Sequence, residues 1–147
     1  MTLSTNYTSR ISALKELATQ VRECTLQLLH VPEPDWLTWS PPSTSNHILW
    51  HGGHALWVQD VLCVMPLTGR SELPALWEES FGQHCRPVAT TSTWPDESEV
   101  RALLVAQLDA IRLLLDEHAE TIAINADERP PGRRLAALGR HDSRLAR

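Results

Sequence analysis

The sequence predicts an all-α fold, a four-helix bundle in which a long crossover joins the second and third helices. Three long segments carry apolar residues at helical spacing, and no segment of any length shows the alternation of a β-strand. Residues 66–96, between the second and third of these segments, are rich in proline and glycine. A connection of that length allows helices two and three to run parallel. The 147 residues fit one domain, 1–147, large enough to bury a core.

Residues 8–30 are predicted to form the first helix, which Pro32 and Pro34 end. Its apolar residues recur at helical spacing, with charged residues on the other side. The apolar set is Ile11, Leu14, Leu17, Ala18, Val21, Cys24 and Leu28. This pattern predicts an amphipathic helix.

The second helix is predicted at about residues 45–65. Three residues before it are typical helix caps, namely Ser43, Thr44 and Ser45. Pro66, followed by the turn residues Thr68 and Gly69, is expected to stop it.

The remaining helices follow the crossover. Within it, only residues 73–81 (LPALWEESF) favour a short helical piece. The third helix, residues 95–118, opens with Asp96 and Ser98 as caps and acidic residues in its first turn. A short, weaker fourth helix is predicted over residues 134–147, at the C-terminus.

Composition limits the classes of partner and the compartment. The net charge of -5 gives no indication of nucleic acid or an anionic membrane as partner. Six arginines follow residue 128, against the single acid Asp142, but no aromatic residues alternate with them, so a solvated helix face is favoured over a nucleic-acid site. The three cysteines form no CxxC pair, which favours a reducing compartment. With no signal peptide and no membrane span expected, the protein is predicted to be cytoplasmic.

Three histidines concentrate in the second helix. At 100° per residue, His47, His51 and His54 fall on one side, continued by an apolar row that consists of Val58, Val61 and Met65. This side is predicted to face the core. Because a buried imidazole needs a hydrogen-bond partner or a metal, three on one face at spacings of four and three indicate a metal site as readily as satisfied core histidines.

Two further features of this helix have alternative interpretations. Leu49, Leu56 and Cys63 form a second apolar seam at seven-residue spacing, which allows a dimer interface. Trp50 and Trp57 flank the histidine side, where they would either wall a pocket or pack in the core. Core packing is the favoured interpretation, since large aromatic residues dominate such cores.

The segment TSNHILWHGGHALWVQDVL, with its W-H-x-x-H-x-x-W centre, resembles the second-helix signature of the DinB-like superfamily, which includes the YfiT-type metal-dependent hydrolases. GRSELPALWEESFG and WPDESEVRALL resemble the crossover and the start of the third helix in that family. The resemblance covers roughly residues 8–125. It implies a four-helix bundle, often dimeric, holding a divalent nickel, zinc, iron or manganese ion with three histidines.

The resemblance assigns one metal ligand to His54 and the other two to an HxxxH motif on the fourth helix. This chain has only His141 there, with Leu145 four residues on. The ligand set therefore becomes His54, His51 and His141, with His47 as another substitute. A water or a partner chain could also complete the site, or the site is incomplete and no metal is held.

Family members include hydrolases and thiol-dependent transferases, so the resemblance implies a metal-dependent enzyme acting on a small molecule or a thiol. The alternative is a non-catalytic, stress-related bundle that forms homodimers. Three other histidines are not expected to be ligands: His118 ends the third helix at the far end of the bundle, His30 ends the first, and His84 lies in the crossover, where it could cover the site. No catalytic base is evident: Asp60 lies off the histidine face.

Overall fold

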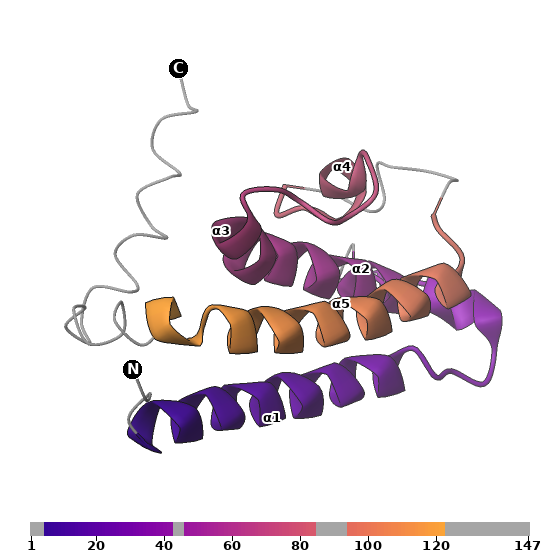
Figure 1. The fold of residues 1–147 in the computed structure, drawn as a ribbon. Helices are drawn as coiled ribbons and strands as arrows, with labels where there is room; N and C mark the ends of the chain where they lie inside the picture. The colour runs from indigo at the N-terminus through magenta and orange to yellow at the C-terminus, as the bar shows by residue number, and fades with distance from the viewer. Residues whose placement is uncertain (1–4, 43–45, 85–93, 123–147) are drawn as a thin grey trace.

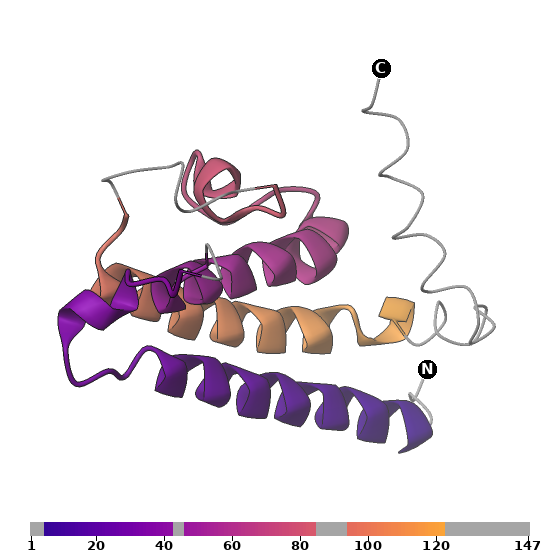
Figure 2. The ribbon, with the colours of Figure 1, turned by 180° about the vertical axis from the view of Figure 1, so that it is seen from behind.

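The computed structural model describes residues 5–42, 46–84 and 94–122, and these residues form helices and connecting loops with no strand. The long helices are α1 (Thr5–Leu28), α2 (Ile48–Gln59) and α5 (Glu97–Glu117). α5 packs against both α1 and α2. α2 and α5 run in the same direction and α1 runs opposite to them (Figures 1 and 2). The predicted all-α fold is confirmed, while the fourth helix expected at 134–147 lies outside the described residues.

The crossover carries the short helix α4 (Trp77–Phe81), within the predicted piece at 73–81, and a 3-10 turn η1 (Pro34–Leu37) joins α1 to α2. α4 covers the side of α2 that faces away from α1 (Figure 1). The Trp77 indole Nε1 donates to the Gly53 carbonyl at 3.0 Å. The Phe81 ring lies so close to Gly53 that a Cβ there would be 2.2 Å from it. Glycine at this position therefore lets α4 sit directly on α2.

Two apolar clusters form the core. The larger joins α2, α4, α5 and the end of α1, and contains Leu29, Leu49, Trp50, Leu56, Trp77, Phe81, Val100 and Leu104. The smaller lies at the opposite end of the long helices and contains Ile11, Val64, Ile111, Leu115 and Ala119. Three buried polar residues accompany these clusters in the middle of the helices: Arg22, Asp60 and Gln107. None of the described helices is long and apolar enough to cross a membrane.

Both ends of the second helix differ from the prediction. It begins after His47, which is the N-cap in place of Ser43, Thr44 or Ser45. It also continues past Pro66 through a π-helical turn, η2 (Asp60–Val64), into α3 (Met65–Thr68), and ends at Gly69 with φ of 81°. In a regular α-helix the ring of Pro66 would clash with a carbonyl one turn earlier. The wider π turn places Pro66 in the first turn of a new α-helical segment, where its missing N–H costs nothing.

The most buried side of α2 is also not the predicted one, although His47 on the predicted side is buried as well. Leu49 and Leu56, assigned to a second apolar seam, are 3 % and 0 % exposed, whereas His51 and Met65 lie on the exposed side. The reason is the pair Gly52 and Gly53, which occupies the buried side and lets Leu29, Val100 and Phe81 approach the backbone. The seam of Leu49 and Leu56 is therefore core rather than a surface open to dimerisation.

The inward side of α1 carries the buried cation Arg22 as well as the apolar Ile11. Arg22 is 1 % exposed and donates hydrogen bonds to the side chains of Gln59 and of Gln107, the latter at 2.8 Å. Four residues of the predicted apolar side lie at the surface instead: Leu14, Leu17, Val21 and Leu28. The predicted helix is confirmed, but its orientation is set by polar contacts to its neighbours.

Candidate functional site

His54 is held in one orientation by the crossover. Its Nδ1 lies 2.7 Å from the carbonyl oxygen of Phe81 in α4. Since a carbonyl only accepts, Nδ1 carries the proton and donates it, and in the neutral ring Nε2 keeps its lone pair. A histidine whose second ring nitrogen is held by a backbone carbonyl is a common arrangement for a metal ligand.

Two indoles restrict the His54 ring further. Trp50 stacks on it with centroids 4.4 Å apart and planes 14° apart, and Trp57 lies 5.6 Å away at 24°. Trp50 is 6 % exposed and belongs to the core, as the favoured interpretation predicts. Trp57 also packs against this core, and its outer side lines a cavity of about 440 Å³ together with Glu78 and His84. The two tryptophans thus take different roles: one supports the histidine from the core, and the other forms a pocket wall.

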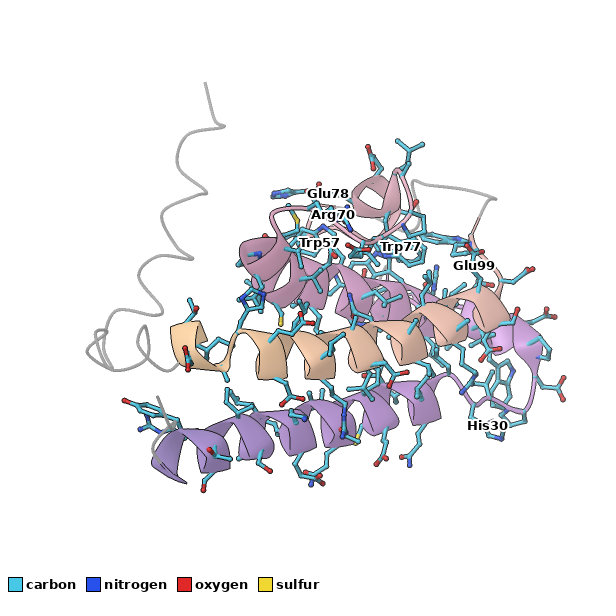
Figure 3. All side chains as sticks on the ribbon, viewed as in Figure 1. His30, Trp57, Arg70, Trp77, Glu78 and Glu99 are labelled. Atoms are coloured by element: carbon cyan, nitrogen blue, oxygen red, sulfur yellow. The ribbon has the colours of Figure 1, made fainter. Side chains whose placement is uncertain are left out.

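Figure 3 shows Trp57, Trp77 and Glu78 gathered where α4 covers α2, and His30 at the distant end of α1. The cavity beside Trp57 is also lined by Glu79, Gly82 and Gln83. Gly82 directly follows the residue whose carbonyl holds His54, so this cavity adjoins the histidine. It offers carboxylates and an imidazole to a bound molecule.

His51 lies one turn before His54, exposed at the surface and edge-on to Trp50, with centroids 5.2 Å apart. Partial burial of its ring and the neighbouring His54 lower the pKa of His51. The lowered pKa favours the neutral imidazole at neutral pH, the form that binds a metal ion.

His47 has a structural role that the sequence analysis did not predict. Its Nδ1 accepts a hydrogen bond from the backbone N–H of Trp50 at 3.0 Å and so caps α2. The ring is 5 % exposed and packs edge-on against Trp94, with centroids 4.7 Å apart. Burial lowers its pKa, and His51 lowers it further, while the backbone of Leu37 opposes both. Because the cap occupies the Nδ1 lone pair, His47 is poorly suited to replace a missing metal ligand.

The other candidate ligands are distributed as follows. His118 caps the C-terminal end of α5, at the end of the bundle away from the start of α2 (Figure 1). This position agrees with the expectation that His118 is not a metal ligand. His141 lies outside the described residues. Within residues 5–42, 46–84 and 94–122, no three His, Cys, Asp or Glu side chains are grouped so that they could hold a metal ion. Of the predicted set, the structure therefore places His54 and His51 together and leaves His141 untested.

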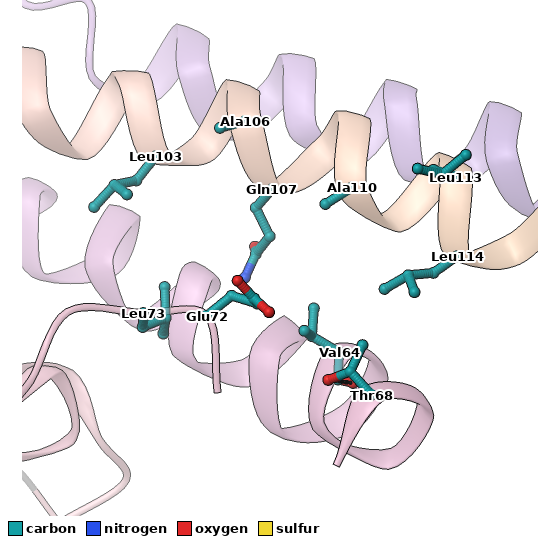
Figure 4. A pocket seen from close by; sticks show the side chains of 10 residues that line it. All are labelled: Val64, Thr68, Glu72, Leu73, Leu103, Ala106, Gln107, Ala110, Leu113 and Leu114. Atoms are coloured by element: carbon teal, nitrogen blue, oxygen red, sulfur yellow. Dashed lines mark hydrogen bonds between the residues drawn. The ribbon is translucent and has the colours of Figure 1, made fainter. Parts of the chain in front are cut away.

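Sequence reasoning missed a second cavity, of about 410 Å³, between α5 and the η2–α3 segment (Figure 4). Gln107 lines it from α5, and Glu72 and Leu73 line it from the opposite side. The buried Asp60 accepts a hydrogen bond from the backbone N–H of Glu72 at 3.1 Å. Asp60 thus ties the loop after α3 to the π-helical turn and is no base for chemistry at His54. A π-helical turn is often an indication of a functional site, but sequence periodicity does not reveal it.

The comparisons with known proteins identify the family of the chain. No curated protein and no solved structure matches the chain. The family model of the DinB superfamily matches residues 17–144, a range that includes His54, the crossover and His141. That range covers most of the 147 residues. The chain therefore belongs to the DinB superfamily.

Proposed function

We propose that this protein is a divalent-metal-binding enzyme of the hydrolase or thiol-transferase type, with His54 as the central ligand. The observation that carries the proposal is the hydrogen bond between His54 Nδ1 and the Phe81 carbonyl. It leaves the lone pair of Nε2 in a fixed position, from which it can bind a metal ion. His51, on the preceding turn, and His141 are the further ligands proposed. A divalent nickel, zinc, iron or manganese ion held there would act as a Lewis acid and lower the pKa of a bound water or thiol.

The residues around His54 fix its orientation and line the adjoining cavity. Trp50 and Trp57 hold the imidazole plane, so the donor atom keeps one direction. The bond from Trp77 to the Gly53 carbonyl holds α4, and with it the Phe81 carbonyl, over the histidine. The adjoining cavity of about 440 Å³ is large enough for a small substrate, and its glutamates offer proton acceptors.

A second candidate function is a non-catalytic bundle with a degenerate site. It is favoured by the capping role of His47, which removes one substitute ligand, and by Leu145 in the place of a fourth-helix histidine. In that case His54 is a core histidine satisfied by Phe81 and the two tryptophans.

Metal analysis of the full-length protein decides between the two. After loading with zinc, nickel, manganese or iron(II) and removal of free ion, we expect about one equivalent of metal in the wild type. His54→Gln should lose it, since one fixed donor is gone, and His141→Gln should weaken binding at least tenfold. His30→Gln is the matched control, because His30 is exposed and distant from α4. Stoichiometric metal retained in His54→Gln would exclude the proposed site.

Metal-dependent thermal stability provides an independent measurement. A ligand that binds only the folded chain raises the melting temperature once its concentration exceeds its dissociation constant, and the rise grows with the logarithm of concentration. We expect the proposed ion to stabilise the wild type and His30→Gln, but not His54→Gln. If no ion stabilises the wild type and none is retained, the non-catalytic alternative holds.

A further inference from the structure

We propose that a cavity beside the start of α2 is a binding site for a small aromatic cation that carries a hydrogen-bond acceptor. The cavity has a volume of about 730 Å³ and lies between the η1 turn, the segment that follows it and the first turns of α2. Pockets for small molecules have this size, with mostly apolar walls and a few polar groups that set the orientation of the ligand. Four of its lining residues supply the recognition: Trp36, Trp39, His47 and Asp35.

Two tryptophans provide apolar walls for this cavity. Trp36 and Trp39 are 52 % and 62 % exposed, and neither belongs to the two apolar clusters of the core. Pro34 opens the η1 turn, and the Trp36 N–H donates to the Glu33 carbonyl at 3.0 Å. Since proline fixes its own backbone φ, the turn holds these indoles in place before a ligand binds. Exposed indole faces can stack on an aromatic ring or attract a cation.

His47 contributes a buried hydrogen-bond donor. Its Nδ1 accepts the N–H of Trp50, so the neutral ring carries its proton on Nε2. The residue is 5 % exposed, and Nε2 has no hydrogen-bond partner in the part of the chain that the structure describes. The backbone of Leu37 is near enough to raise the pKa of His47, but this contact lacks the geometry of a hydrogen bond. Because buried polar groups normally have a partner, we expect the bound molecule to offer an acceptor here.

Asp35 sets the sign of the charge that the cavity favours. It lies exposed in the first turn of η1. Apart from the two histidines, it is the one ionisable residue among the described residues that line the cavity. A carboxylate attracts a cation, and the negative faces of the indoles attract it as well. An anion would be repelled by both.

The site adds to the proposed function and does not depend on it. None of the four recognition residues is a proposed metal ligand. His51 also lines the cavity, so a molecule bound here would lie beside the proposed metal site.

Titration calorimetry of the full-length protein in buffer with EDTA tests the proposal without any metal. Three probes share one phenol ring: tyramine carries an ammonium group, tyrosol is neutral and 4-hydroxyphenylacetate is an anion. We expect tyramine to bind at one site about tenfold more tightly than tyrosol, and 4-hydroxyphenylacetate to bind more weakly than either. Phenethylamine lacks the phenolic oxygen that would accept from His47 Nε2, so it should bind less tightly than tyramine.

Substitutions at exposed positions separate the contributions of ring and charge. Trp36→Ala and Trp39→Ala should each weaken the binding of tyramine and of tyrosol by about tenfold. Asp35→Asn should remove the preference for tyramine over tyrosol and leave the binding of tyrosol unchanged. Glu33→Gln is the matched control, because Glu33 precedes the same turn but does not line the cavity. Circular dichroism should be the same for all four variants, since these side chains are exposed.

Nuclear magnetic resonance of the indole N–H groups of the six tryptophans locates the bound molecule. Tyramine should shift the signals of Trp36 and Trp39, which the two alanine variants assign. Shifts confined to Trp57 would place the molecule in the cavity beside α4 and overturn the proposal.

Three results of the calorimetry would also overturn it: no binding of any probe, equal affinity for tyramine and 4-hydroxyphenylacetate, or a preference for tyramine that persists in Asp35→Asn. His54→Gln, which should lose the proposed metal, should bind tyramine as the wild type does. A failure of this site is therefore distinct from a failure of the metal site.

Discussion

Arg22 is a buried cation with neutral partners, and replacing it together with Gln107 should stabilise the protein. The guanidinium donates to the amide oxygens of Gln59 and Gln107, while its Nε and Nη1 have no hydrogen-bond partner within the described part of the chain. No carboxylate among the described residues is bonded to it. Burial lowers the pKa of Arg22 from its ordinary value to about 10. That difference corresponds to roughly 3 kcal/mol against the folded state at neutral pH, at about 1.4 kcal/mol per pH unit.

The change in stability on replacing Arg22 depends on whether Gln107 is replaced as well. Arg22→Met alone removes the charge but leaves the buried Gln107 oxygen without its donor, which costs about 1–3 kcal/mol, so we expect stability near that of the wild type. Gln107→Met alone removes an acceptor from a buried cation and should destabilise by about 2 kcal/mol. Arg22→Met/Gln107→Met removes both problems and should stabilise the protein by about 1–3 kcal/mol, as replacing buried charge with apolar volume often does.

Urea denaturation followed by circular dichroism measures all four proteins of this cycle. The folded chain releases the Arg22 proton from about pH 10, at a lower pH than the unfolded chain does, so the burial penalty is complete below pH 10 and falls as pH rises above it. The advantage of the double variant should therefore shrink from pH 8 to pH 11. A double variant less stable than the wild type at pH 8, or an advantage independent of pH, would refute the reasoning.

Three further predictions concern α2 and α4. Gly53→Ala should destabilise the protein by about 3 kcal/mol and weaken the proposed metal binding, because its Cβ would lie 2.2 Å from the Phe81 ring. Gly52→Ala, whose Cβ would have its nearest contact at 3.2 Å, should cost less than half of that free energy in thermal denaturation. Equal losses in the two variants would contradict this. Trp77→Phe should lose about 1 kcal/mol with the Gly53 hydrogen bond, measured by thermal denaturation. Because the pKa of His47 is lower in the folded chain than in the unfolded chain, the unfolded chain binds more protons below about pH 6.5. The free energy of unfolding therefore falls as the pH drops below that value. His47→Asn should keep the cap and flatten the pH profile between pH 5 and 7; an unchanged profile would assign the effect to other groups.

The sequence predicted where the helices are better than which sides of them are buried. The first helix follows directly from its periodicity, but periodicity assigns the inner side by the polarity of large side chains. Arg22 reverses that assignment in α1, because it satisfies part of its hydrogen bonding inside the core. Gly52 and Gly53 reverse it in α2, since they have no side chain to count and yet allow the closest packing. Both errors come from contacts between helices that are distant in the sequence.

The candidate site, too, could be predicted from the sequence only in part. Spacing and family resemblance select His54, and composition flags the long crossover as a segment that requires an explanation. The link between the two is a hydrogen bond from His54 to a backbone carbonyl 27 residues later, and a carbonyl carries no sequence signature. Trp77 and Gly53 fix that carbonyl in place through α4. The crossover therefore acts as the support that sets the orientation of His54, and changes in α4 should alter the proposed metal binding without changing any proposed ligand.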